Sequence, residues 1–144
     1  MTKFSAWAAA LIVLLLGSAA AAQSTTSQST AKYRVVFQVS DADPAKWQLA
    51  LANARNAQID LGRNNVQIEI VAYGPGLGML REGSKVEGRL AEALESNIGL
   101  IACENTMQAL KITKADMYPG ISFAPAGVTH LMKRQMEGWT YIRP

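Results

Sequence analysis

The sequence predicts an α/β domain built on a mainly parallel sheet that is covered by helices on both faces. Segments with the pattern of strands alternate along the chain with segments that have the periodicity of helices. The crossovers between successive strands are too long for hairpins, which favours parallel pairing. Residues 98–103 form a short, nearly continuous apolar run, as expected of a strand buried on both faces. The order of the strands does not follow from these patterns.

The first 22 residues have the pattern of a secretory signal peptide. Lys3 supplies a positive charge, residues 6–16 form an unbroken apolar stretch, and the segment ends in the alanine run 19–22. A retained membrane anchor is the alternative, but the apolar stretch is shorter than the ~20 residues that cross a bilayer. The segment therefore predicts an exported protein, periplasmic or secreted, with no stable membrane anchor after cleavage.

Residues 23–32 (QSTTSQSTAK) contain no large apolar side chain and predict a flexible Ser/Thr-rich linker. Residues 33–144 remain as one domain of about 110 residues, which is long enough to bury a core without disulfides. The net charge is +3, and removal of the signal takes away Lys3 and no acidic residue. The charges are interspersed and form no basic stripe, so nucleic acid is not an expected partner.

The domain begins with a strand and a long helix. Residues 33–39 are rich in β-branched and aromatic side chains and predict the first strand. Asp43 is placed to cap a helix over residues 45–61, with Pro44 at its first position and Gly62 as its stop. The apolar residues expected on one broad face of this helix are Trp47, Leu49, Ala50, Leu51, Ala54, Ala57, Ile59 and Leu61.

The middle of the domain repeats this alternation. Residues 66–73 predict a second strand, followed by a glycine-rich loop over residues 74–78 (GPGLG). A helix is expected over residues 85–96, the buried strand over 98–103, and a short helix over 104–110.

The last part of the domain predicts a turn over residues 116–120 and a fourth strand over 121–125. A helix follows over residues 128–137, and residues 139–142 predict an edge strand. The buried face of this last helix is expected to consist of Val128, Leu131, Met132 and Met136.

Cys103, the single cysteine, is the first candidate for chemistry. It lies where a buried strand ends and a helix begins, the edge at which open α/β sheets bind ligands. Free N–H groups in the first turn of that helix would favour its thiolate, whereas Glu104 opposes ionisation unless its side chain turns outward. The alternative is a small buried hydrophobe, as most free cysteines are. The position of Cys103 and the expected compartment favour neither a reactive thiol nor a structural one.

Residues on two segments are candidates to line the pocket of this cysteine. Asn105 and Thr106 occupy the first turn after it, where they either line the pocket or cap the helix. Gly74, Pro75 and Gly76 follow the second strand at the same sheet edge. They predict either an anion-binding nest or pocket wall, or a plain turn. Their spacing is not that of a dinucleotide-binding fingerprint.

The single histidine, His130, is a weaker candidate, as a base for Cys103. By helical spacing it projects to the side of the expected buried face of its helix. No cluster of histidine, cysteine and carboxylates has the spacing of metal ligands, so the sequence predicts neither a metal site nor a cofactor. The methionines expected in the core, rather than as copper ligands, are Met117, Met132 and Met136.

The residues around the cysteine resemble the DsrE/DsrF-like (DsrEFH) family, in particular its small YchN-like branch. The resemblance is carried by residues 103–107 (CENTM), 112–117 (ITKADM) and 119–120 (PG). The loop over 73–77 and the ending over 126–144 are similar to that family too, so the resemblance spans essentially the whole domain. It implies a three-layer α/β/α fold with four to five strands. It also implies homo-oligomers, commonly trimers or hexamers, with the cysteine near a subunit interface.

Three functions remain open at this stage. Cys103 matches the position at which sulfur-relay members of the family carry a persulfide, which implies a sulfur carrier or sulfurtransferase with a donor or acceptor protein as partner. The second candidate is a non-enzymatic oligomeric module that binds a small ligand or a partner and has a structural cysteine. The third is a thiol peroxidase or oxidoreductase, although such an enzyme usually needs a resolving thiol that this chain lacks.

Overall fold

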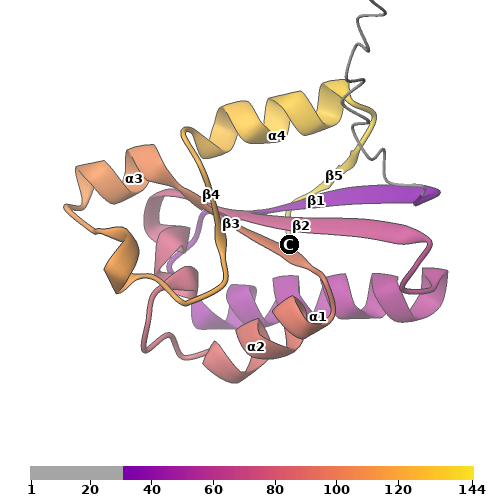
Figure 1. Cartoon of the computed structure of the whole chain (residues 1–144), viewed down its shortest axis with the longest axis horizontal. Helices are drawn as coiled ribbons and strands as arrows, with labels where there is room; N and C mark the ends of the chain where they lie inside the picture. The colour runs from indigo at the N-terminus through magenta and orange to yellow at the C-terminus, as the bar shows by residue number, and fades with distance from the viewer. Residues whose placement is uncertain (1–30) are drawn as a thin grey trace, which may run out of the picture.

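The computed structural model describes residues 31–144, which fold into one sheet of five parallel strands with helices packed around it (Figure 1). The strands are β1 (Tyr33–Val39), β2 (Val66–Ala72), β3 (Gly99–Cys103), β4 (Ser122–Ala124) and β5 (Thr140–Ile142). Their order across the sheet is β4-β3-β2-β1-β5, and every pairing in it is parallel. The predicted signal peptide and the predicted linker up to residue 30 lie outside the described residues.

Helical segments connect these strands. They are α1 (Pro44–Leu61), the 3₁₀ helix η1 (Gly74–Leu80), α2 (Glu87–Glu95), α3 (Glu104–Ala109), the 3₁₀ turn η2 (Lys114–Asp116) and α4 (Gly127–Met136). None of the helices within residues 31–144 combines the length and the apolar character needed to cross a bilayer.

The helices form one layer on each face of the sheet (Figure 1). α1 and α2 cover one face, and the larger apolar core lies between them and the sheet, with Phe37, Ile68, Ile70 and Leu100 from the strands. α4 covers the other face, over a smaller cluster that includes Val36, Val71, Ile101, Leu131 and Trp139. The structure thus confirms the predicted α/β fold, with a parallel sheet between helical layers, and supplies the strand order.

The start and the end of α1 follow the predicted signals. The Asp43 carboxylate accepts a hydrogen bond from the backbone N–H of Ala45 at 2.9 Å, and Pro44 is the first helical residue. Gly62 ends the helix with φ +88°, a conformation that side chains rarely adopt. The predicted buried face was too broad, since Leu49 and Ile59 are exposed. The helix packs through a narrower stripe: Trp47, Ala50, Leu51, Ala54 and Gln58.

The glycine-rich segment after β2 is a 3₁₀ helix rather than the predicted irregular loop. Its backbone approaches the end of β1 closely. A Cβ atom at Gly76 would lie 2.4 Å from the carbonyl oxygen of Val39, so only glycine fits there. Gly74 has φ +53° and begins η1 directly after the half-buried Tyr73. The conformation and packing of the backbone therefore explain why two of these positions are glycine, which the spacing alone did not reveal.

The buried face predicted for α4 is wrong. Leu131 is buried, but Val128, Met132 and Met136 point to solvent, and Met136 is 87% exposed. Met117 does lie in the core, as expected. The helix is turned by the buried carboxylate of Glu69 on β2, which binds two polar side chains of α4. An apolar pattern alone assigns the wrong face when a helix docks partly through charge.

Candidate functional site

Cys103 is the last residue of β3 and lies directly before α3. It is paired in register with Ala124 of β4, so both strands end at the same edge of the sheet. This confirms the predicted position of the cysteine, at the carboxyl ends of the parallel strands. The residue is 5% exposed, so its sulfur lies mostly beneath neighbouring side chains and backbone.

The sulfur of Cys103 accepts a hydrogen bond from the backbone N–H of Gly127 at 3.2 Å. Gly127 is the first residue of α4, where free N–H groups carry the partial positive charge of a helix N-terminus. A side chain at this position would be crowded by its neighbours. A Cβ atom at Gly127 would lie 3.1 Å from the Cβ of Tyr73 and 3.3 Å from the Cβ of Cys103. Close packing of a glycine therefore brings the amide to the sulfur.

A second set of donors comes from the start of α3 and from η1. The backbone N–H of Gly74 donates to the hydroxyl oxygen of Thr106 at 3.0 Å. Because that oxygen accepts from Gly74, its own hydrogen remains available, and the Thr106 hydroxyl donates it to Cys103. A short relay of donors thus runs from the predicted glycine segment to the sulfur.

These donors decide the acidity of the thiol. Burial by itself raises the pKa of Cys103, because it disfavours the charged thiolate. The opposing effects are larger in sum: hydrogen bonds from the Thr106 hydroxyl, the Gly127 N–H, and the N–H groups of Thr106 and Asn105. The net result is a pKa below the ordinary value of the thiol. The Asn105 N–H also donates to the carbonyl oxygen of Pro125 at 3.1 Å.

The remaining predicted pocket residues divide into two groups. Thr106 is brought to the sulfur, and the N–H of Gly74 binds the hydroxyl of Thr106. Gly76 packs instead against the end of β1, and the side chains of Pro75 and Asn105 are exposed. The carboxylate next to the cysteine, that of Glu104, pairs with Lys114 at 3.0 Å, which offsets the charge that opposes thiolate formation.

The single histidine does not act on the cysteine as the sequence hypothesis had it. Nε2 of His130 lies 2.7 Å from a carboxylate oxygen of Glu69, on the α4 face of the sheet. Arg134, one turn further along α4, binds the same carboxylate through two nitrogens at 2.9 and 2.6 Å. The histidine therefore belongs to a hydrogen-bonded polar cluster that attaches α4 to β2.

The sequence interpretation missed two residues next to the sulfur, Tyr73 and Gly127. Burial, together with the charges of Tyr141 and Cys103, raises the pKa of the Tyr73 phenol above its ordinary value. Gly127 follows a strand and begins a helix, a pattern that is visible in residues 122–127 and that would have indicated an amide at the sheet edge.

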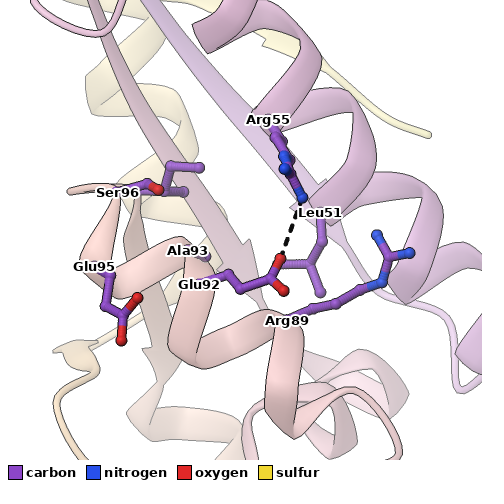
Figure 2. Close-up of a pocket in the computed structure, with 8 residues that line it drawn as sticks. Leu51, Arg55, Arg89, Glu92, Ala93, Glu95 and Ser96 are labelled. Carbon is purple, nitrogen blue, oxygen red and sulfur yellow. Dashed lines mark hydrogen bonds and ion pairs between the residues drawn. The ribbon is translucent and has the colours of Figure 1, made fainter.

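Other hollows in the surface lie away from Cys103. Figure 2 shows a groove between α1 and α2 with a volume of about 210 Å³, lined in part by Leu51, Arg55 and Glu92. Arg55 and Glu92 face each other across it at 3.4 Å, and both are exposed. The groove reaches Ile98, at the amino end of β3, whereas Cys103 ends that strand. No group of three or more histidine, cysteine or acidic side chains in residues 31–144 is arranged to hold a metal ion.

Comparisons with solved structures agree with this architecture. MTH1491 of Methanobacterium thermoautotrophicum, a protein of unknown function, superposes with a TM-score of 0.74 and 38% identity, over 78% of this chain and 99% of its own. BT1422 of Bacteroides thetaiotaomicron, also of unknown function, superposes with a TM-score of 0.60 and 17% identity, over 77% of this chain and 94% of its own. The ychN protein of E. coli superposes with a TM-score of 0.58 and 12% identity, over 79% of this chain and 99% of its own. The last two likenesses show the fold alone.

No curated protein matches the chain. The model of the DsrE/DsrF-like family, in contrast, matches residues 31–144, which are the residues that contain the sheet, its helical layers and Cys103. With 38% identity to MTH1491 over most of the domain, this match confirms the resemblance noted in the sequence. The chain belongs to the DsrE/DsrF-like family.

Proposed function

We propose that this protein is an exported sulfur carrier of the sulfurtransferase type, in which Cys103 holds the transferred sulfur as a persulfide. Membership of a family with a sulfur-relay-type fold supports the reaction class. The observation that carries the proposal is the set of donors on the sulfur of Cys103, from Gly127 and Thr106, which lowers the pKa of the thiol. A thiolate, rather than a thiol, is the form that reacts with sulfane sulfur.

The proposed transfer is a thiol–persulfide exchange. The thiolate of Cys103 attacks the outer sulfur of a donor persulfide, and a new S–S bond forms while that of the donor breaks. The bonding electron pair leaves with the donor, which departs as a thiolate. No external oxidant or reductant is needed. The sulfur passes to an acceptor by the same exchange, in which the thiolate of the acceptor attacks the outer sulfur of the Cys103 persulfide.

The test is intact-mass spectrometry of the natively folded protein after incubation with a small sulfane-sulfur donor such as inorganic polysulfide. We expect wild type to gain a sulfur atom that a reductant removes, and Cys103→Ser to gain none. The unfolded wild-type chain serves as a control for chemical competence of the thiol. A folded protein that stays unmodified under conditions in which the unfolded chain reacts would contradict the proposal.

The second candidate function is a non-enzymatic binding module with a structural cysteine. The observation that favours it is the burial of Cys103, which is 5% exposed. Under this alternative, Cys103→Ala keeps both the oligomeric state and the cellular role of the protein, and thiol reagents modify the wild type only after unfolding.

Export is part of the proposal and rests on residues 1–22. We expect the mature chain in the periplasm or the medium, shortened at about Ala22. Fractionation of cells that express the full-length gene, followed by N-terminal sequencing, tests this. A full-length product that remains with the cytoplasmic fraction would contradict it.

Self-association is the remaining part of the proposal. Val128, Met132 and Met136 form an exposed apolar stripe on α4, at a spacing of four residues centred on Met132. Under a twofold axis through that centre, two antiparallel copies place Met132 against its equivalent and Val128 against the partner's Met136. The stripe is thus complementary to itself, which suits a homo-oligomer such as a hexamer that contains twofold axes. Because α4 begins at Gly127, such a contact lies beside the cysteine.

A further inference from the structure

Glu69 is a carboxylate buried in the centre of the sheet. It lies in the middle of β2, is 7% exposed, and faces the layer that contains α4. Gly99 on the neighbouring strand leaves room for it, since a Cβ atom there would lie 3.2 Å from Cγ of Glu69. A buried carboxylate is costly unless charged or polar groups bind it, so its partners indicate what it holds in place.

Both side chains that bind Glu69 come from α4 and stand one helical turn apart. Nε2 of His130 lies 2.7 Å from one oxygen, which Nε of Arg134 also reaches at 2.9 Å. Nη2 of Arg134 lies 2.6 Å from the other oxygen. This forked contact restricts both the rotation of α4 about its axis and its position along β2, because planar guanidinium and carboxylate groups bind in few geometries.

Apolar packing on α4 is scarce, so this charge cluster is a main attachment of the helix. Within the described chain, Gly127 and Leu131 are the residues of α4 that are buried. The apolar side chains that would strengthen its docking, Met132 among them, face solvent. Loss of the cluster would therefore leave α4 held by Leu131, by its start at Gly127 and by its connections to β4 and β5.

The same helix carries the amide that binds the sulfur. Gly127 precedes His130 by three residues, less than one turn, and its N–H donates to Cys103 at 3.2 Å. We propose that Glu69 is a positioning residue: through His130 and Arg134 it fixes the start of α4, and thereby holds the Gly127 N–H on the sulfur of Cys103. The effect of this positioning on sulfur transfer rests on the proposed function, in which this thiolate receives the sulfur. The positioning of the Gly127 N–H does not rest on it.

The experiment measures the ionisation of Cys103 and not sulfur transfer, so its failure is distinguishable from failure of the sulfur-carrier proposal. Glu69→Gln removes the charge of the carboxylate and keeps its size. We follow the ultraviolet absorbance of the thiolate against pH in the full mature chain, with Cys103→Ala subtracted to remove the tyrosine signal. We expect the titration of Glu69→Gln to shift upward by about half a pH unit, which lowers the thiolate fraction about threefold below the midpoint.

Glu137→Gln is the matched control. Glu137 also binds Arg134, at 2.8 Å, but it is exposed at the end of α4, whereas Glu69 is buried in β2. We expect this variant to titrate like the wild type, so a shift confined to Glu69→Gln identifies the buried contact as the cause. Equal upward shifts in both variants would overturn the proposal, since they would show that the buried contact with Glu69 is not what holds the amide on the sulfur; loss of a negative charge by itself would shift the titration downward.

A second variant covers the case in which Glu69→Gln does not fold. His130→Leu leaves Arg134 on the carboxylate and removes the contact nearest Gly127, because leucine has no group that binds a carboxylate. Circular dichroism establishes that each variant is folded before its thiol is titrated. The same upward shift in His130→Leu supports the proposal, and a folded Glu69→Gln or His130→Leu with the wild-type titration overturns it.

Discussion

Gly127 and Cys103 lie 24 residues apart in the chain, and yet the backbone N–H of the first donates to the sulfur of the second at 3.2 Å. The contact joins the end of β3 to the start of α4, the helix that follows the neighbouring strand β4. In an all-parallel sheet, every such strand-to-helix junction lies at the same edge, so adjacent strands bring their following turns together. The acidity of one thiol thus depends on two separate junctions.

Gly127→Ala tests this contact directly. The added methyl group would lie 3.1 Å from Cβ of Tyr73 and 3.3 Å from Cβ of Cys103, so these neighbours or the start of α4 must shift by a few tenths of an ångström. We expect a loss of about 1–3 kcal/mol in unfolding free energy from overpacking, together with an upward shift of the Cys103 titration. Urea denaturation and thiolate absorbance measure the two effects.

Gly88→Ala is the control for that substitution. Gly88 lies in α2, where a Cβ atom meets nothing within 4 Å. Replacement by alanine there is expected to raise the unfolding free energy by about 0.5–1 kcal/mol, because alanine favours the helix. Equal effects of the two substitutions would show that the space around Gly127 is not restrictive.

The Thr106 hydroxyl is the link between η1 and the sulfur. In Thr106→Val the shape of the side chain is kept, but the N–H of Gly74 loses its acceptor and Cys103 loses a donor. We expect a destabilisation of about 1 kcal/mol and a higher pKa of Cys103, both measured as for Gly127→Ala. Thr106→Ser retains the hydroxyl and should titrate like the wild type. A Thr106→Val protein whose thiol titrates normally would rule out the relay.

The lowered pKa of Cys103 also predicts a pH dependence of stability. In the folded protein the thiol ionises below its ordinary value of 9.0, whereas in the unfolded chain it ionises near that value. Between the two pKa values the unfolded state binds more protons, so stability from this group grows as pH rises through the window. This contribution to the unfolding free energy is fully present above pH 9.0 and is lost as the pH falls through the pKa of Cys103 in the folded protein.

The measurement compares wild type with Cys103→Ala by urea denaturation at a series of pH values. The difference in unfolding free energy between the two proteins should change in favour of wild type as the pH rises from the folded pKa of Cys103 toward 9.0, and then level off. A difference that stays constant with pH, or that changes in the opposite direction, would show that the folded protein does not favour the thiolate.

The exposed stripe on α4 gives a prediction about assembly. Met132→Lys places a charge at the centre of the stripe and should shift the protein to a smaller species in sedimentation or light scattering. Ile59→Lys is the control, because Ile59 is 70% exposed on α1, the helix of the other layer. A wild-type protein that is monomeric, or a Met132→Lys protein that assembles normally, would exclude α4 as the contact.

The fold was predictable because its signals are local. The strand-like residues 33–39, the cap at Asp43 and the stop at Gly62 act over a few residues, and the structure contains each feature. The position of Cys103 followed in the same way, from a short apolar run that ends before a helix. These patterns reflect burial and backbone conformation, which neighbouring residues largely determine.

The details of the site were not predictable, because they depend on contacts that are distant in the chain. Glu69 lies among strand residues as a polar side chain of no assigned role, and nothing near it in the sequence indicates that it is buried against α4. Without knowledge of that contact, the apolar spacing predicts that Met132 and Met136 lie in the core, whereas both are exposed. Gly127 likewise has a role only when the ends of β3 and β4 are side by side.

The burial of the single sulfur has a consequence for how this chain meets oxidants. Cross-linking of two molecules requires their cysteine Cα atoms to approach within about 7 Å. A residue that is 5% exposed at the end of an interior strand cannot make that approach while its surroundings stay closed. Folded copies therefore resist covalent pairing with one another, even in a compartment that favours it.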